Sequence, residues 1–283
     1  MRVQRIPHRI WHYTRKLAYA SKTSSPFISP DTFMRIADLS LDKNFYPGIQ
    51  KIKEASVIFV NSGDADKFFC EYASVINAKV LIFGNNDVDF NCFDFPISKS
   101  VKNIFLQNST ITDSFFQTIP IGIESLKYVT NGVPQLFSSK YVEVVKNDRI
   151  LVGPFGNTHI ERAALQAKAV KSFSKVDFVY ERLKPIEYAS LSSSYAVIAC
   201  PRGNGLDTHR FWESLYRGSV PLVKESPWSN YWSRKGVPMI EIADWECDLD
   251  QILGGASRNL EFNPDDLEIL WEPFWYSEIR QRV

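Results

Sequence analysis

The sequence predicts an α/β fold built from mostly parallel strands and divided into two similar units. Short apolar runs alternate with longer helical stretches, which is typical of strand–helix–strand units. A polar and broken stretch over residues 131–148 interrupts this alternation near the middle of the 283-residue chain. We therefore expect an N-terminal domain over residues 1–135 and a C-terminal domain over residues 149–283.

The first unit begins with a less regular arm and continues with alternating strands and helices. The expected elements are, in order, a strand at 57–61, a helix over about 64–77, a strand at 80–83, and strands at 103–106 and 118–123. The strand at 80–83 ends in the polar turn 84–87, which contains a glycine and two asparagines. This pattern predicts a Rossmann-like unit on a parallel sheet.

The second unit is the more regular of the two. Its expected elements are a strand at 150–152, a helix from about residue 158, a strand at 176–180, a helix opened by Pro185 and a strand at 195–199. Thr158 and Glu161 have the spacing of a capping box. The right-handed crossover rule makes such a βαβαβ series a parallel sheet, so a second Rossmann-like unit is predicted. The tail, residues 265–283, is rich in Trp and Phe and predicts one or two short helices.

Bulk composition favours a soluble, cytoplasmic protein. The formal net charge is +1, so attraction of the whole molecule to nucleic acid is not indicated. No window approaches the ~20 apolar residues of a membrane span. The scattered cysteines form no CxxC or Cys/His cluster, which favours reduced thiols. They are Cys70, Cys92, Cys200 and Cys247.

Residues 1–16 combine basic and apolar side chains. The basic ones are Arg2, Arg5, Arg9, Arg15 and Lys16, with Ile6, Ile10, Trp11 and Tyr13 between them. One interpretation is a peripheral anchor that rests on anionic lipid at the inner face of a membrane. The alternative is an ordinary leading strand or helix with a solvated basic edge.

The segment from Cys200 to Val223 carries the chemistry. An apolar strand stops at a loop with two glycines, and a helix over about 208–217 follows. In an α/β fold, ligands bind where a strand's carboxyl end meets a helix N-terminus, and the helix dipole favours an anion. Arg202 and Arg210 add donors for a diphosphate, and Glu213 can accept hydrogen bonds from ribose hydroxyls. The alternative is a simple turn in which Arg210 and Glu213 pair with each other.

This segment gives the candidate ligand-binding residues. They are Arg202, Gly203, Asn204, Gly205, Asp207, His209, Arg210 and Glu213. Asp207 or Thr208 suits the N-cap of the helix, and His209 either acts in catalysis or is a surface or capping residue. Arg162 joins the group from the first helix of the second unit, because strand ends of one parallel sheet converge on one crevice. A surface arginine on an ordinary helix is the alternative for Arg162.

Residues 200–223 resemble the donor-binding segment of exostosin-like glycosyltransferases and are similar in layout to that of the α1,3-fucosyltransferases. The shared features are a Pro-x-Gly loop, Arg-x-x-Glu on a helix, and Gly-x-Val-Pro. More weakly, Asn108 and Pro120-Ile-Gly122 are similar to bacterial polysaccharide relatives of this group. The strong match covers about 25 residues of the 283.

The resemblance implies a GT-B-like fold, with two Rossmann-like domains facing a central cleft and C-terminal helices packing back. It implies a glycosyltransferase that uses a nucleotide-sugar donor and a glycan or polyprenol-linked acceptor in surface polysaccharide synthesis. Arg202 and Arg210 would then meet the diphosphate, and Glu213 would hold the ribose.

Inverting sugar transfer needs a base for the acceptor hydroxyl, expected from the N-terminal domain. Asp87 is our first candidate and Asp64 the second, because each follows a strand end. A helix cap or turn residue is the alternative for both. Residues 64–66 and 87–89 each read Asp-x-Asp, the motif with which GT-A transferases hold a divalent metal.

Two further hypotheses therefore remain open, a metal-dependent GT-A-type transferase and a non-catalytic nucleotide- or glycan-binding module. The favoured hypothesis, a GT-B-like glycosyltransferase, requires no cofactor, because the nucleotide-sugar is a substrate. A divalent metal is possible but not favoured, since Arg202 and Arg210 can neutralise the diphosphate.

Overall fold

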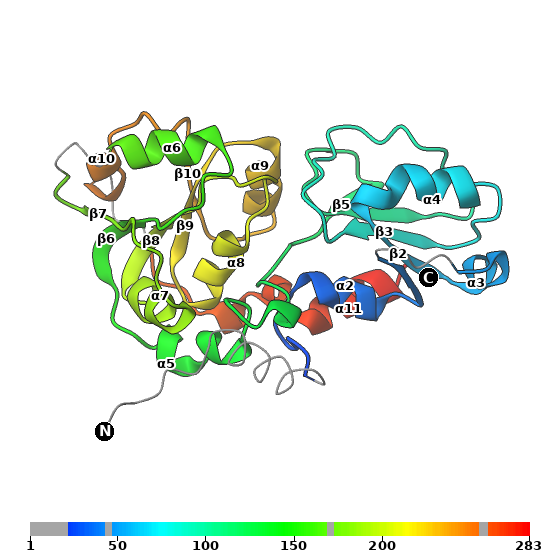
Figure 1. The fold of residues 1–283 in the computed structure, drawn as a ribbon, viewed down its shortest axis with the longest axis horizontal. Coiled ribbons are helices and arrows are strands. Elements are labelled where there is room, and N and C mark those ends of the chain that lie inside the picture. Colours follow the sequence, from blue (N-terminus) through cyan, green and yellow to red (C-terminus); the bar gives the residue numbers. More distant parts are fainter. Residues whose placement is uncertain (1–21, 43–46, 169–172, 255–259) are drawn as a thin grey trace, which may run out of the picture.

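The computed structural model describes residues 22–42, 47–168, 173–254 and 260–283. These residues form two parallel β-sheets of five strands each, which lie beside one another (Figure 1). The predicted α/β fold with two parallel-sheet units is therefore confirmed. No helix in the described part is long and apolar enough to cross a membrane. The basic residues 1–16, considered above as a membrane anchor, lie outside the described part.

The first sheet has the strand order β1-β2-β3-β4-β5, so neighbouring strands follow each other along the chain. Its strands are β1 (Leu39–Leu41), β2 (Val57–Asn61), β3 (Val80–Gly84), β4 (Asn103–Leu106) and β5 (Phe116–Thr118). The helices interleaved with it are α2 (Pro30–Ile36), α3 (Ile49–Glu54) and α4 (Ala65–Tyr72).

Apolar side chains alternate along these strands and are buried on both faces of the sheet. On one face, Ile58 packs in a cluster with Phe68 of α4. On the opposite face, Phe59 belongs to a larger cluster that includes Phe33 of α2 and Trp275 of α11 (Glu272–Arg280). The first sheet is thus covered by helices on both sides.

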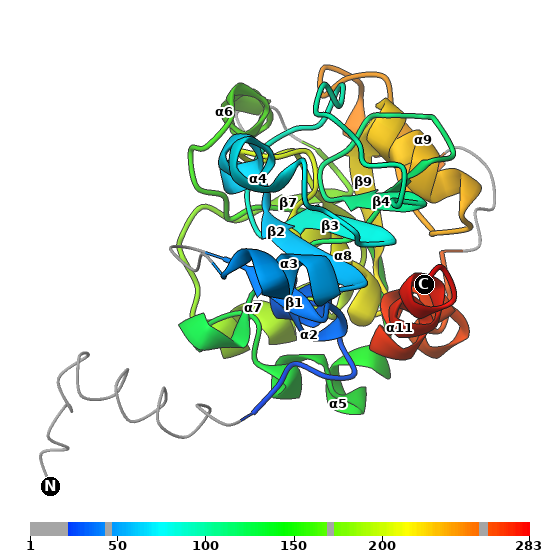
Figure 2. The same ribbon diagram turned by 90° about the vertical axis from the view of Figure 1, so that its right-hand side faces the viewer.

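The last helix, α11, lies against α2 rather than against the second sheet, as both views show (Figures 1 and 2). The rings of Phe33 and Trp275 meet edge to face with their centroids 5.7 Å apart. Arg280 of α11 forms an ion pair with Asp38 at 2.7 Å. The C-terminal residues therefore contact the part of the molecule that contains the first sheet.

The second sheet has the order β10-β9-β8-β6-β7. Its strands are β6 (Asn147–Val152), β7 (Val176–Phe178), β8 (Tyr195–Ala199), β9 (Val220–Lys224) and β10 (Ile240–Ile242). From β6 the chain winds first to β7 on one side and then to β8 on the other. Such a reversal leaves a crevice at the carboxyl ends of the two strands that flank it, and this is where open α/β sheets bind ligands. Here those strands are β6 and β8.

Helices also surround the second sheet. They are α5 (Ser139–Val142), α6 (Ile160–Ala167), α7 (Pro185–Ser192), α8 (His209–Tyr216), α9 (Pro227–Arg234) and α10 (Leu249–Gly254). Short 3-10 turns occur at Ser62–Asp64, Leu126–Tyr128, Pro134–Phe137, Pro264–Asp266 and Glu268–Leu270. Phe211 and Trp212 of α8 are buried in the same cluster as Phe59 of the first sheet, so apolar contacts run continuously between the two sheets.

The strands predicted at 57–61, 103–106 and 195–199 are confirmed with the same limits. The strand predicted at 118–123 is wrong, because β5 ends at Thr118. Pro120 has no N–H for a ladder, and Gly122 turns the chain with a φ of 66°. The sequence did not predict β1, α2, α3, α5, α9, β10 or α10, most of which are short.

Candidate functional site

Two loops flank the crevice at the carboxyl edge of the second sheet. One follows β6, and its Gly153 has a φ of 90°. A Cβ atom there would lie 2.2 Å from the carbonyl oxygen of Val179, so only glycine fits. The other loop follows β8 and leads through Gly203 into α8. The β6 loop leads into α6, so two helix N-termini lie beside the crevice.

Arg210 is the second residue of α8 and reaches across to the β6 loop. Its Nη2 donates to the carbonyl oxygen of Pro154 at 2.6 Å. The guanidinium lies over the rings of Phe155 and Tyr188, 4.6 and 5.0 Å from their centroids. Its Nη1 is buried and has no hydrogen-bond partner. Arg210 therefore has one donor whose hydrogen-bonding capacity the described residues leave unsatisfied.

Arg162 is the third residue of α6 and approaches the same place from the other side. Its Nε donates to the carbonyl oxygen of Arg202 at 3.0 Å, and its guanidinium also contacts the ring of Phe155. Burial and the positive charge of Arg210 lower the pKa of Arg162. A Cβ atom on Gly203 would lie 2.8 Å from Nη2 of Arg162, so this glycine makes room for the guanidinium.

Within the described residues, no carboxylate lies within 4.0 Å of Arg162 or Arg210. The two guanidiniums are close enough to repel each other, and both lie at helix N-termini that already favour negative charge. Such an arrangement disfavours the empty site and favours a bound anion. The structure thus brings together two cations that the sequence analysis selected.

Arg202 is placed differently from the expectation. Its Nη2 forms an ion pair with Asp89 of the first sheet's loops at 2.9 Å. The same atom donates to the carbonyl oxygen of Asn204 at 3.0 Å, and its Nε is buried without a partner. The guanidinium of Arg202 is thus directed to a carboxylate. It joins the part of the molecule that contains the first sheet to the part that contains the second sheet, and these parts are called the two halves below.

Asp207 ties the β8 loop to the first half of the molecule. Its side chain is 3% exposed, and its Oδ2 accepts from the backbone N–H of Ile121 at 2.7 Å. Its Oδ1 accepts from Nε1 of Trp212 at 2.6 Å, and its own N–H donates to Oδ1 of Asn108 at 2.7 Å. Of the two N-caps expected for α8, the structure has Thr208. Asp207 is thus engaged by protein donors on both oxygens.

Asn108 of the first half packs tightly against the β8 loop. It is buried and adopts a positive φ of 56°. A Cβ atom on Gly205 would lie 2.7 Å from both terminal atoms of the Asn108 side chain. Gly205 is therefore required for the two halves to approach, and this explains why a glycine stands at that position.

The buried carboxyl group of Asp207 predicts a pH dependence of stability. Burial raises its pKa from the ordinary value of 3.8 to about 8, against the opposing effect of its hydrogen bonds. Between these values the folded state retains a proton that the unfolded state releases. The contribution of Asp207 to the free energy of unfolding therefore falls as the pH rises from about 4 to 8. Urea unfolding at several pH values checks this, and Asp207→Asn should lack this fall in the free energy of unfolding between about pH 4 and 8. A free energy of unfolding that rises over this range in wild type relative to Asp207→Asn would contradict it.

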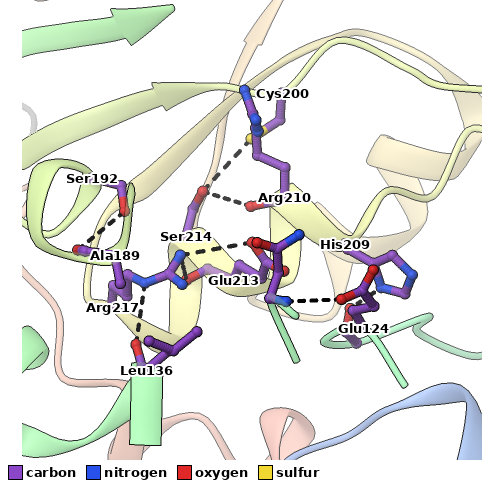
Figure 3. Close-up of polar contacts among 12 residues, drawn as sticks. Glu124, Leu136, Ala189, Ser192, Cys200, His209, Arg210, Glu213, Ser214 and Arg217 are labelled. Atoms are coloured by element: carbon purple, nitrogen blue, oxygen red, sulfur yellow. Dashed lines mark hydrogen bonds and ion pairs between the residues drawn. The ribbon is translucent and has the colours of Figure 1, made fainter. Parts of the chain in front are cut away.

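Glu213 does not reach the crevice in this structure. It is 5% exposed, and its Oε2 lies 3.8 Å from Nη1 of the buried Arg217, one turn further along α8 (Figure 3). The alternative pairing with Arg210 is not seen within 4.0 Å. Its carboxylate stands among buried groups, and Glu213 lines neither of the two pockets described next.

A pocket of about 240 Å³ lies between the two halves. It is lined by Pro30, Asn85, Asn86, Asp87, Ile121, Ser125, Tyr128 and His209. Asp87 is exposed, and its Oδ2 accepts from Nδ2 of Asn204 at 3.1 Å. Nδ1 of His209 lies 2.8 Å from the carbonyl oxygen of Gly122. The loop expected to supply a base and the loop expected to bind the donor thus meet here.

Asp64 is not part of this pocket. It ends the turn Ser62–Asp64 and is the N-cap of α4. Of the two aspartates predicted as bases, the structure therefore brings only Asp87 to the pocket between the halves. Within the described residues, no group of three or more His, Cys, Asp or Glu side chains is arranged to hold a metal ion.

A second pocket, of about 210 Å³, opens at the carboxyl ends of β8 and β9. It is lined by Glu161, Cys200, Arg202, Leu206, Val223, Lys224, Glu225, Ser226 and Trp228. Glu161 accepts from Nε1 of Trp245 at 3.0 Å, whereas Glu225 is exposed. Burial raises the pKa of Cys200 to about 12, so this thiol stays protonated. Glu225 and Ser226 were not among the predicted site residues, although they come directly after the apolar run at 220–223, which was a usable signal.

No protein-family model and no curated protein matches the sequence. Among solved structures, the fold is similar to that of AviGT4, a glycosyltransferase involved in avilamycin A biosynthesis. The match has a TM-score of 0.39 and 12% sequence identity, and it covers 80% of this chain and 83% of that one. At that score the likeness is distant.

Proposed function

We propose that the protein transfers a sugar from a nucleotide-sugar to a hydroxyl group of a glycan or lipid-linked saccharide. The observation that carries this proposal is the pair Arg162 and Arg210 at the crevice between β6 and β8. Two neighbouring guanidiniums without a carboxylate partner in the described residues match the charge of a diphosphate. The helix N-termini of α6 and α8 add backbone N–H groups.

The pocket at the ends of β8 and β9 lies next to this pair, because Arg202 lines the pocket and its carbonyl oxygen accepts from Arg162. We place the nucleoside there. Since Glu213 is buried against Arg217, we assign the ribose hydroxyls to Glu225 instead, whose exposed carboxylate lines the pocket. Arg202 then approaches the diphosphate only if its ion pair with Asp89 opens.

The pocket between the halves is the proposed acceptor site. Its polar lining, with Asn85, Asn86 and Asp87, suits a sugar that carries several hydroxyl groups. In this arrangement donor and acceptor meet across the contact between Asn204 and Asp87. We propose that no divalent metal is needed, because the two arginines supply the positive charge that a metal would supply.

Binding and turnover test this function. Thermal-shift screening against UDP-, GDP-, CMP- and dTDP-sugars identifies the donor, and calorimetry measures its affinity with and without EDTA. We expect micromolar binding that survives EDTA, together with slow hydrolysis of the donor in the absence of an acceptor. Binding without any turnover, with or without added glycan acceptors, would identify a non-catalytic module. Loss of activity in EDTA would favour the metal-dependent alternative.

The assignment of Glu225 predicts a selective effect. Glu225→Gln should weaken binding of the matching nucleoside diphosphate about tenfold, because a carboxylate accepts two ribose hydroxyls better than an amide does. Affinity for inorganic pyrophosphate should not change, since that probe has no ribose. Calorimetry with both probes checks the prediction, and Glu181→Gln, at an exposed position outside both pockets, is the matched control. An equal loss of affinity for both probes would contradict the assignment of Glu225 to the ribose.

A further inference from the structure

His209 is held in one tautomer by the backbone. Its Nδ1 lies 2.8 Å from the carbonyl oxygen of Gly122, and a carbonyl oxygen can only accept a hydrogen bond. Nδ1 therefore carries the proton, and Nε2 of the neutral ring has a free lone pair. A histidine oriented by a carbonyl group in this way is a base with a defined direction.

The carbonyl group of Gly122 is itself fixed in place. Gly122 has a φ of 66°, and a Cβ atom on it would lie 2.1 Å from the carbonyl oxygen of Ile28. The neighbouring N–H of Ile123 donates to that same oxygen at 2.8 Å, and the N–H of Ile121 donates to Asp207. The turn that orients His209 is thus held on both sides by buried contacts.

His209 also stands where the proposed substrates meet. It is the first residue of α8, it lines the pocket between the halves, and the next residue is Arg210 of the anion site. The acidic group that lines this pocket is Asp87, whose Oδ2 already accepts from Nδ2 of Asn204.

We propose that Nε2 of His209 is the general base of the transfer and that Asp87 orients the acceptor. This inference rests on the proposed function. Nε2 removes the proton of the acceptor hydroxyl while that oxygen forms a bond to the anomeric carbon of the donor. The bond from this carbon to the β-phosphate oxygen breaks, and its electron pair leaves with the nucleoside diphosphate. Attack opposite the leaving group inverts the anomeric configuration.

The test compares His209→Gln with wild type, using the nucleotide-sugar that wild type turns over and water or added glycans as the acceptor. The amide of Gln can still donate to Gly122, so the fold is preserved. We expect kcat to fall 100- to 10,000-fold, while the Kd for the matching nucleoside diphosphate changes less than threefold. Glu181→Gln, at an exposed position outside both pockets, is the control and should leave kcat within twofold of wild type.

The outcomes separate this inference from the function on which it rests. Absence of turnover by wild type with every donor overturns both. Wild-type turnover that persists in His209→Gln overturns only the assignment of the base, and a larger loss in Asp87→Asn would transfer that role to Asp87. Nitrogen-15 spectra of histidine-labelled protein give an independent check, with the ring signal that His209→Gln removes expected to be that of the Nδ1–H tautomer.

Discussion

We expect the double variant Arg162→Met/Arg210→Met to bind the matching nucleoside diphosphate about a thousandfold more weakly than wild type. Each guanidinium contributes about 2 kcal/mol through charge-assisted hydrogen bonds to the phosphates, and a loss of about 4 kcal/mol corresponds to that factor. Methionine keeps the apolar length of the side chain against the ring of Phe155, so the packing is largely retained.

The same variant should not be less stable than wild type. The two guanidiniums repel each other, and the one on Arg210 has a buried donor with no partner. Relief of these two unfavourable terms offsets the loss of the hydrogen bonds to the carbonyl oxygens of Pro154 and Arg202. Calorimetry and urea unfolding measure the two effects together. Arg234→Met, at an exposed arginine in the last turn of α9, is the control. A double variant that keeps wild-type affinity, or that loses affinity only because it unfolds, would contradict the account.

Asp207→Ala is expected to destabilise the protein by about 4 kcal/mol. The change leaves two buried donors without acceptors, the N–H of Ile121 and Nε1 of Trp212, and each unsatisfied group costs about 2 kcal/mol. It also frees the loop that carries Gly205 from the turn at Ile121, which weakens the contact between the halves.

Asp207→Asn should cost less than Asp207→Ala, because the amide oxygen still accepts from one of the two donors. Urea unfolding followed by tryptophan fluorescence measures both variants. Asp265→Ala, at an exposed residue near the chain's end, is the control and should change the free energy of unfolding by less than about 0.5 kcal/mol. Equal stability of wild type and Asp207→Ala would show that the buried carboxylate contributes nothing to the fold.

The sequence was most informative where an element is defined by its own residues. β2 and β8 are five-residue strands that are buried throughout, and all their residues except Asn61 are apolar, so composition alone marks them. The position of the candidate crevice was predictable for the same reason, since it depends on where a strand stops and a helix begins. Arg162 and Arg210 were selected by that rule, and the structure places both at the reversal of strand order.

The sequence was least informative where a partner lies far away along the chain. The sequence allowed Asp207 to be a helix cap or a ligand-binding residue. Only the fold brings the N–H of Ile121, 86 residues earlier, to the side chain of Asp207. Glu213 has cationic neighbours three residues before it and four residues after it on one helix, and local spacing cannot choose between them. In the structure Glu213 lies next to Arg217, because Arg210 extends instead toward Pro154 in the β6 loop.

The most direct test of the central claim is a crystal structure of the protein with the nucleoside diphosphate that binds best. We predict that the diphosphate lies within hydrogen-bond distance of the guanidiniums of both Arg162 and Arg210, beside the N-termini of α6 and α8. A diphosphate bound elsewhere on the protein, with these two arginines in the positions described here, would contradict the account.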